Sequence, residues 1–189
     1  MSLKLIRGIT LSLIVCILPG ISANAAEIEG VIFPEKYTAD ELELELRGFG
    51  LLRYMVFVKA YVGGLYLPAG TAVDQILSGV PKRLEVEYFQ TFKGEAFGQA
   101  TNKIIAKNVD PETLERLRPK IEYHNSLYQD VEPGDRYSLT YIPGRGTELA
   151  LNGVPKGIVE GSEFADALFS VWFGPNPIDK SFKKQLLGL

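Results

Sequence analysis

Arg53 and Lys59 have the clearest potential for chemistry, because both lie inside a long apolar stretch, residues 48–67. β-Branched and aromatic residues dominate this stretch, which predicts a single central strand. Strand alternation would place both cations on one face with Met55, Phe57 and Tyr61. A charged group among apolar neighbours is costly unless it is paired or solvated. The two cations therefore need an explanation.

Two explanations fit this face. In the first, the face is partly exposed, or the cations pair with carboxylates on neighbouring strands, the candidates being Glu43, Glu45, Glu85 and Glu87. In the second, a helix layer stands off from the sheet and leaves a cleft, where Arg53 is a bidentate donor for an anionic head group. Met55 and Phe57 would line the apolar part, and Tyr61 would add a hydroxyl donor. Such a pocket suits a fatty or aromatic acid.

The rest of the chain offers little catalytic chemistry. His124 is the single histidine and stands in a polar helical stretch, so we expect it to be exposed and incidental. The sequence contains no nucleophile elbow, phosphate-binding loop, dinucleotide fingerprint or paired-histidine metal motif. We therefore expect no metal and no cofactor. The formal net charge of -3 gives no electrostatic reason to bind nucleic acid.

Residues 1–25 are predicted to be a signal peptide. Lys4 and Arg7 precede an apolar core, residues 9–18, that is too short to span a membrane stably. Ala23-Asn24-Ala25 then fits a signal peptidase site. An uncleaved anchor is the competing interpretation. We expect an exported protein, periplasmic or secreted, with no stable membrane span after cleavage.

Cleavage would leave one domain, residues 26–189, without a thiol. The single cysteine, Cys16, lies inside the predicted signal peptide. The mature chain would therefore have no disulfide, cysteine nucleophile or thiolate metal site.

The remaining pattern predicts an antiparallel sheet. Apolar and polar residues alternate, or apolar runs end at turn residues, over 30–33, 42–46, 83–89, 136–141, 147–151 and 156–159. Asn152-Gly153 indicates a hairpin within a final three-stranded meander. Gly48 and Gly50 suggest a bulge, a turn or a close backbone approach, and Gly63-Gly64 suggests a further bulge.

Helices are predicted in the middle and at the end of the chain. The expected segments are 69–79, 94–107, a helix started by Asp110-Pro111 that kinks or stops before Pro119, 121–128, a helix capped by Ser162, and one starting at Asn176-Pro177. About seven strands and five helices without a β-α-β repeat indicate the α+β class.

Five segments, in order, resemble the chalcone isomerase-like proteins, particularly their exported bacterial branch. They are 48–53, 57–67, Pro133-Gly134-Asp135, Leu151-Asn152-Gly153, and 164–174 with its ending Trp172-Phe173-Gly174. The resemblance implies an open-faced β-sandwich, in which a large antiparallel sheet carries a helix layer on one face and a ligand cleft lies between them. The family includes plant chalcone isomerases, which cyclise a chalcone to a flavanone. It also includes fatty-acid-binding relatives that use the same cleft without known turnover.

The resemblance also implies roles for single residues. Arg53 matches the family's arginine that holds the anionic part of the ligand. Tyr61 stands where the plant enzymes have a threonine, Phe97 where they have a tyrosine, and Ile104 near their asparagine. Ser170 stands for a threonine or serine on the late helix. The predicted ligand-binding residues are Arg53, Met55, Phe57, Tyr61, Phe97 and Ser170.

We therefore expect an exported, non-catalytic protein that binds a small hydrophobic carboxylate, such as a fatty acid, between sheet and helices. The first alternative is an isomerase, an intramolecular lyase acting on a chalcone-like or unknown substrate through Arg53, Tyr61 and Ser170. The second alternative is a structural or partner-binding module. Lys59 is expected to have a surface or salt-bridge role.

Overall fold

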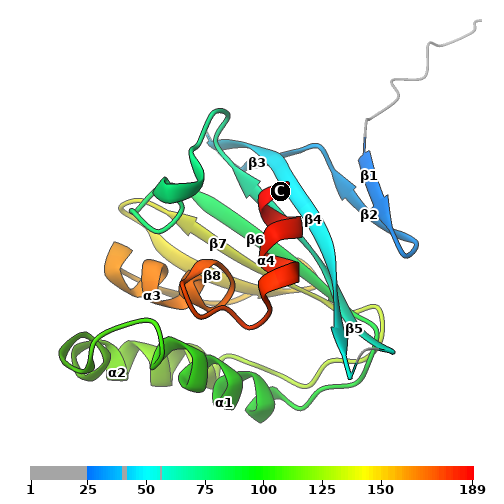
Figure 1. Cartoon of the computed structure of the whole chain (residues 1–189). Coiled ribbons are helices and arrows are strands. Elements are labelled where there is room, and N and C mark those ends of the chain that lie inside the picture. The colour runs from blue at the N-terminus through cyan, green and yellow to red at the C-terminus, as the bar shows by residue number, and fades with distance from the viewer. Residues whose placement is uncertain (1–24, 40–41, 56) are drawn as a thin grey trace, which may run out of the picture.

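The computed structural model describes residues 25–39, 42–55 and 57–189. The predicted signal peptide, except for Ala25, lies outside these residues. Seven antiparallel strands form one sheet in the order β3-β4-β5-β6-β7-β8-β9, and β1 and β2 form a separate two-stranded sheet (Figure 1). The strands are β1 Ala25–Ile28, β2 Val31–Pro34, β3 Lys36–Ala39, β4 Leu42–Tyr54, β5 Val58–Leu67, β6 Lys82–Tyr88, β7 Arg136–Ile142, β8 Gly146–Leu151 and β9 Val154–Val159.

The helices gather on one side of the large sheet, as Figure 1 shows. They are the short 3-10 helix η1 Val73–Gln75 and the α-helices α1 Gly94–Ile105, α2 Pro111–Ser126, α3 Ser162–Phe173 and α4 Lys180–Leu187. The main hydrophobic core lies between these helices and the sheet. The predicted α+β class and open-faced sandwich are confirmed.

The predicted central strand is wrong in one respect, because residues 48–67 form a hairpin and not one strand. β4 ends at Tyr54, β5 begins at Val58, and the two strands pair antiparallel. The chain reverses at Met55, whose φ of 48° lies in the left-handed region. Glycine or asparagine usually marks such a position. A methionine there made the apolar run look continuous.

Several predicted helix boundaries also differ. The segment 69–79 contains only η1, a single turn, and α2 continues through Pro119 instead of stopping before it. Ser162 is the first residue of α3, and the N-cap position is occupied by Gly161. Asp179, not Asn176, caps α4 by accepting a hydrogen bond from Phe182 N at 2.6 Å. The predicted Asp110 cap of α2 is confirmed, since its carboxylate accepts from Thr113 N.

Gly63 and Gly64 allow different layers to approach both faces of β5. A Cβ at Gly63 would lie 2.8 Å from Phe182 Cζ of α4, and a Cβ at Gly64 would lie 2.7 Å from Phe33 Cδ1 of β2. Successive strand residues point to opposite faces. The helices and the β1-β2 hairpin therefore cover opposite sides of the sheet. The bulge predicted at these glycines is absent, because the pairing of β5 with β4 and β6 is regular there.

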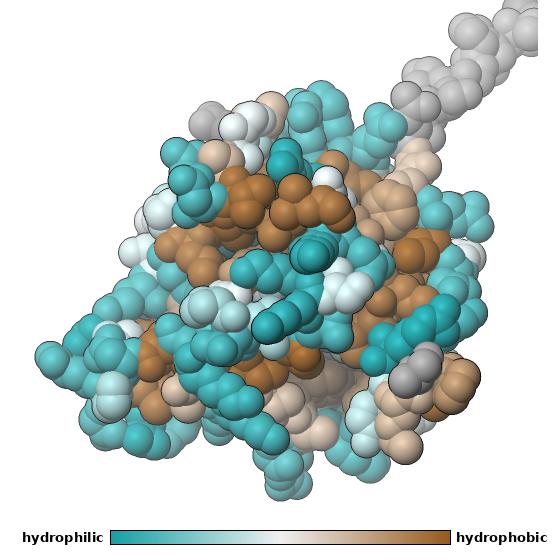
Figure 2. Space-filling model, in the orientation of Figure 1, coloured by the Kyte–Doolittle hydropathy of each residue, from teal (hydrophilic) through white to brown (hydrophobic). Residues whose placement is uncertain are grey.

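Gly48 and Gly50 allow the C-terminal helix, α4, to pack closely against β4. A Cβ at Gly48 would lie 2.5 Å from Gln185 O, and one at Gly50 would lie 2.6 Å from Gln185 Cβ. Arg47 Nε donates to Leu187 O, and Leu51 N donates to Gln185 Oε1. The predicted close approach is thus confirmed, as is a bulge, between Leu46 and Gly48. Figure 2, in the same orientation, shows apolar areas divided by polar side chains on this face of the molecule.

Gly48→Ala should destabilise the protein, because its methyl group would meet the backbone of α4. We expect the free energy of unfolding to fall by about 1–3 kcal/mol, the usual cost of overpacking. Urea unfolding at neutral pH measures this difference. The control is Glu45→Ala on an exposed position of the same strand, which should change stability by less than about 0.5 kcal/mol. Equal effects of the two substitutions would contradict the close approach.

Candidate functional site

A β-bulge at Ala60 separates the two cations from Tyr61. Leu52 pairs with Tyr61 and Arg53 pairs with Lys59, so Ala60 has no partner on β4. The extra residue reverses the alternation of β5. Tyr61 consequently points toward the helices, where its ring lies 5.4 Å from that of Phe182. The prediction that Arg53, Lys59 and Tyr61 share one face is wrong for this reason.

Arg53 and Lys59 instead meet Glu29, in the turn between β1 and β2. Lys59 Nζ donates to Glu29 Oε2 in a short hydrogen bond. Arg53 Nη2 lies 3.8 Å from Glu29 Oε1, which is beyond hydrogen-bond distance, and the Arg53 side chain is 45% exposed. The predicted salt-bridge role of Lys59 is confirmed, although its partner is none of the four predicted glutamates. Arg53 is the more loosely held cation of the two.

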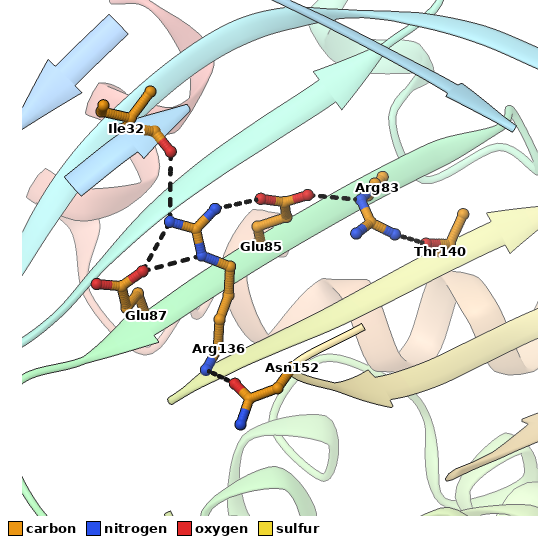
Figure 3. Close-up of polar contacts among 7 residues, drawn as sticks. All are labelled: Ile32, Arg83, Glu85, Glu87, Arg136, Thr140 and Asn152. Atoms are coloured by element: carbon orange, nitrogen blue, oxygen red, sulfur yellow. Dashed lines mark hydrogen bonds and ion pairs between the residues drawn. The ribbon is translucent and has the colours of Figure 1, made fainter. Parts of the chain in front are cut away.

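Two of those glutamates belong to a polar network under the β1-β2 hairpin (Figure 3). Arg136 donates to Glu87 through Nε and Nη2, at 3.0 and 2.7 Å, and to Glu85 Oε2 through Nη1 at 3.0 Å. Arg83 Nε donates to Glu85 Oε1 at 2.8 Å. Arg136 Nη2 also donates to Ile32 O, at 3.3 Å. These charge-assisted bonds satisfy the carboxylates and attach β2 to the sheet.

An aromatic layer fills the space between the sheet and the helices. We use this name for the rings of Tyr61, Tyr88, Phe92, Phe97, Tyr128, Tyr137 and Phe182. Neighbouring rings have centroids 5.1–6.2 Å apart, mostly in edge-to-face or tilted arrangements, as aromatic rings prefer. Two predicted ligand-binding residues, Tyr61 and Phe97, are therefore brought together. Alternation in β6, with Leu84, Val86 and Tyr88 inward, was the sequence signal for part of this layer.

The hydroxyl groups of this layer are neutral. Burial raises the pKa of Tyr61 above its ordinary value, and burial likewise raises the pKa of Tyr88 and of Tyr128. A neutral phenol donates a hydrogen bond but supplies no base at neutral pH. The layer can therefore bind an apolar body with a polar end, and it is poorly suited to proton abstraction.

His124 is buried, contrary to the prediction, with an exposed fraction of 1%. Its ring packs at 5.1 Å from Tyr128 and 5.6 Å from Phe164. Neither ring nitrogen has a hydrogen-bond partner in the described part of the chain. Burial lowers the pKa of His124 to about 4, so the imidazole is neutral near pH 7. The residues around His124 in the sequence are polar, so the pattern gave no sign that this side of α2 is buried.

The other predicted site residues lie elsewhere. Met55 and Phe57 are 70% and 88% exposed at the end of the β4-β5 hairpin, so they line no pocket with Tyr61, and that prediction is wrong. Ser170 is buried in α3, where its hydroxyl donates to Ala167 O. Ser170 also borders a cavity of about 400 Å³ that is lined by α3 residues, by Leu77 and by the α1-α2 connection. The six predicted ligand-binding residues thus fall in three places. These are the end of the β4-β5 hairpin (Arg53, Met55 and Phe57), the aromatic layer (Tyr61 and Phe97) and α3 (Ser170).

Residues 25–39, 42–55 and 57–189 contain no cluster of three or more acidic, histidine or cysteine side chains arranged to hold a metal ion. Within the same residues, no helix has the length and apolar character needed to cross a membrane.

The comparison with protein families identifies the class of protein. The model of the chalcone isomerase-like family matches residues 25–188. The chain belongs to the chalcone isomerase-like family, as the sequence predicted. No curated protein sequence matches the chain.

A solved structure supports the same fold. The chain is similar to a fatty-acid binding protein from Arabidopsis thaliana, with a TM-score of 0.68 and 15% sequence identity. The match covers 87% of this chain and 96% of the plant chain. At this identity the similarity establishes a common fold.

The buried His124 should make stability sensitive to acid. The imidazole has a pKa of about 4 in the folded chain and 6.5 in the unfolded chain, so the unfolded state binds the proton first. The contribution of the neutral His124 to the free energy of unfolding is constant above pH 6.5. It is lost as the pH falls toward 4, by about 3 kcal/mol between pH 7 and pH 4. Between pH 7 and pH 4, the free energy of unfolding of His124→Phe should therefore fall by about 3 kcal/mol less than that of the natural chain.

Urea unfolding of both proteins at several pH values provides the measurement. Other carboxylates with lowered pKa, such as Asp110 and Asp135, also weaken the fold in acid, but they are common to both proteins. An equal acid-induced loss in both would mean that His124 does not titrate as its burial requires.

Proposed function

We propose that this protein is an exported, non-catalytic binding protein for a small hydrophobic carboxylate such as a fatty acid. The apolar body of the ligand enters the aromatic layer on the helix side of the sheet, and its carboxylate passes the end of the β4-β5 hairpin to Arg53, which faces the opposite side. The observation that carries the proposal is the exposure and loose pairing of the Arg53 side chain. It is a half-exposed guanidinium with a long ion pair, one residue beyond the Leu52-Tyr61 pair that borders the layer.

The location of Arg53 suits a charged head group. A carboxylate buried among neutral rings would lose its hydration without a compensating charge. A carboxylate at the end of the β4-β5 hairpin keeps contact with water and gains up to two parallel hydrogen bonds from a guanidinium. Lys59 is less suitable, because Glu29 already accepts a short hydrogen bond from it.

The family and the fold support a ligand in the layer. The plant protein that shares this fold is described as a fatty-acid binding protein. The rings of Tyr61, Phe97 and Phe182 are in contact with neighbouring rings, so an acyl chain enters only if some of them rotate aside. Tyr61 can then donate its neutral hydroxyl to a polar ligand atom.

The absence of a suitable base in the layer favours binding over isomerisation. The Tyr61 hydroxyl stays protonated because burial raises its pKa, and the buried His124 contacts Tyr128 and Phe164. Ser170 Oγ is engaged with the backbone of α3. In addition, the three residues that an isomerase would use lie in separate parts of the fold. Arg53 and Tyr61 face opposite sides of the sheet, and Ser170 is buried in α3.

The packed layer also favours a second candidate function, a structural or partner-binding module. Rings that already fill the space between sheet and helices stabilise the fold without a ligand. This candidate predicts that no acid binds. The two functions are therefore distinguished by the same binding experiment.

Arg53→Ala should weaken the binding of palmitate about tenfold, the order expected when one charge-assisted contact is lost. Binding of palmitic acid methyl ester should be unchanged, because it has no carboxylate. Displacement of a fluorescent fatty acid gives both affinities. Native mass spectrometry of freshly purified protein should also detect co-purified fatty acid.

Lys59→Ala is the matched control, since it removes a cation from the paired position and should change palmitate affinity less than threefold. Tight palmitate binding by Arg53→Ala would remove Arg53 as the anchor. Failure of every acid tested to bind the natural protein would exclude the binding function and favour the second candidate.

Export makes a separate prediction. When residues 1–189 are expressed in a bacterium with a periplasm, the folded protein should be found outside the cytoplasm with Ala26 as its N-terminal residue. Cell fractionation and intact mass determine both. Retention of residues 1–25 on the membrane-bound protein would instead support the uncleaved anchor.

A further inference from the structure

The end of the β4-β5 hairpin exposes an unusual concentration of apolar side chains. Tyr54, Met55, Phe57 and Val58 are 64%, 70%, 88% and 42% exposed. We call these four residues the hairpin tip. Single exposed apolar residues are normal on a protein surface, whereas a contiguous group usually marks an interaction site. At the lower right of Figure 2, where this hairpin ends in Figure 1, apolar residues reach the surface.

The backbone presents these side chains outward at a conformational cost. Tyr54 and Val58 are the last paired residues of the hairpin, and Phe57 N donates to Met55 O within the loop. Met55 has a φ of 48°, where glycine or asparagine would be unstrained. Such strain is a reason to look for function at this turn.

A charged cluster adjoins the hairpin tip and connects it to the β1-β2 turn. Glu29 accepts a hydrogen bond from Lys59 and forms the longer ion pair with Arg53. Two cations and one carboxylate leave a net positive charge next to the apolar side chains. Arg53 and Lys59 are 45% and 44% exposed, so both remain accessible to an external anion.

We propose that the hairpin tip inserts into the interfacial region of a lipid bilayer. Tyr54 and Phe57 provide aromatic rings that favour the boundary between head groups and acyl chains. Met55 and Val58 enlarge the apolar surface, and Arg53 and Lys59 are placed to contact lipid phosphates. The protein would bind on the surface of the membrane without spanning it. This inference does not depend on fatty-acid binding.

The shape of the hairpin tip favours a lipid surface over a second copy of the chain. A stable protein interface usually takes roughly 20–30 residues from each partner, whereas the hairpin tip offers four residues. A narrow projecting turn can enter a fluid bilayer without a complementary groove. Insertion of a few apolar side chains gives weak, reversible binding.

Vesicle flotation tests the proposal on the chain that is expressed at full length and purified after export. The vesicles contain phosphatidylethanolamine and phosphatidylglycerol in a ratio of about 3:1, the second lipid providing the anionic charge. The natural protein should float with the vesicles. The double variant Met55→Asp/Phe57→Asp should reduce the bound fraction about tenfold, because charges do not enter the apolar region.

Val154→Asp is the matched control. Val154 is 57% exposed next to the turn between β8 and β9, so the substitution adds a charge at another hairpin end, and the bound fraction should stay within about twofold of the natural value. Thermal unfolding checks that all variants fold. In a second measurement, the fluorescence of Phe57→Trp should shift to shorter wavelength with vesicles and be quenched by brominated acyl chains.

Three outcomes would overturn the proposal. The first is failure of the natural protein to float, and the second is equal flotation of the double variant. The third is a dimer of the natural protein that the double variant dissociates while neither protein binds vesicles, which would make the hairpin tip an interface between copies. Vesicle binding that follows the hairpin tip in monomeric protein supports the proposal even if palmitate does not bind.

Discussion

The architecture depends on the close approach of two layers to one strand. At Gly63 and Gly64, side chains are absent on opposite faces of β5, so Phe182 of α4 and Phe33 of β2 each come within contact distance of the strand backbone. A side chain at either glycine would separate one layer from the sheet. Gly48 and Gly50 allow α4 to approach β4 equally closely, on one face of that strand. The glycines that looked like strand-weakening residues therefore hold the molecule together as a three-layer structure.

Much of the fold was predictable because it follows from local chemistry. Strict alternation in 83–89, the Asn152-Gly153 turn and the Asp110 cap each have a direct physical meaning, and each is present in the structure. The β4-β5 hairpin was not predictable in this way, since its loop has Met55 where a turn residue is usual. Continuity of α2 through Pro119 is a further case in which tertiary packing overrides a local rule.

The candidate site was predictable only residue by residue. The sequence singled out Arg53 and ranked it above Lys59, and the structure gives Lys59 the tight ion pair and Arg53 the loose one. The bulge at Ala60, which sends Tyr61 to the other face, leaves no mark in the residue pattern. The polar network of Arg83, Glu85, Glu87 and Arg136 depends on cross-strand partners, so its members could be seen in the sequence but their pairing could not.

The contacts between β4 and α4 also have a consequence for the timing of folding. Arg47 and Leu187, which share a hydrogen bond, are 140 residues apart in the chain. Contacts of such long range form slowly, because a large loop must close before they stabilise the structure. One face of β4 stays uncovered until the last residues of the chain are available. The chain would thus complete its core late in folding.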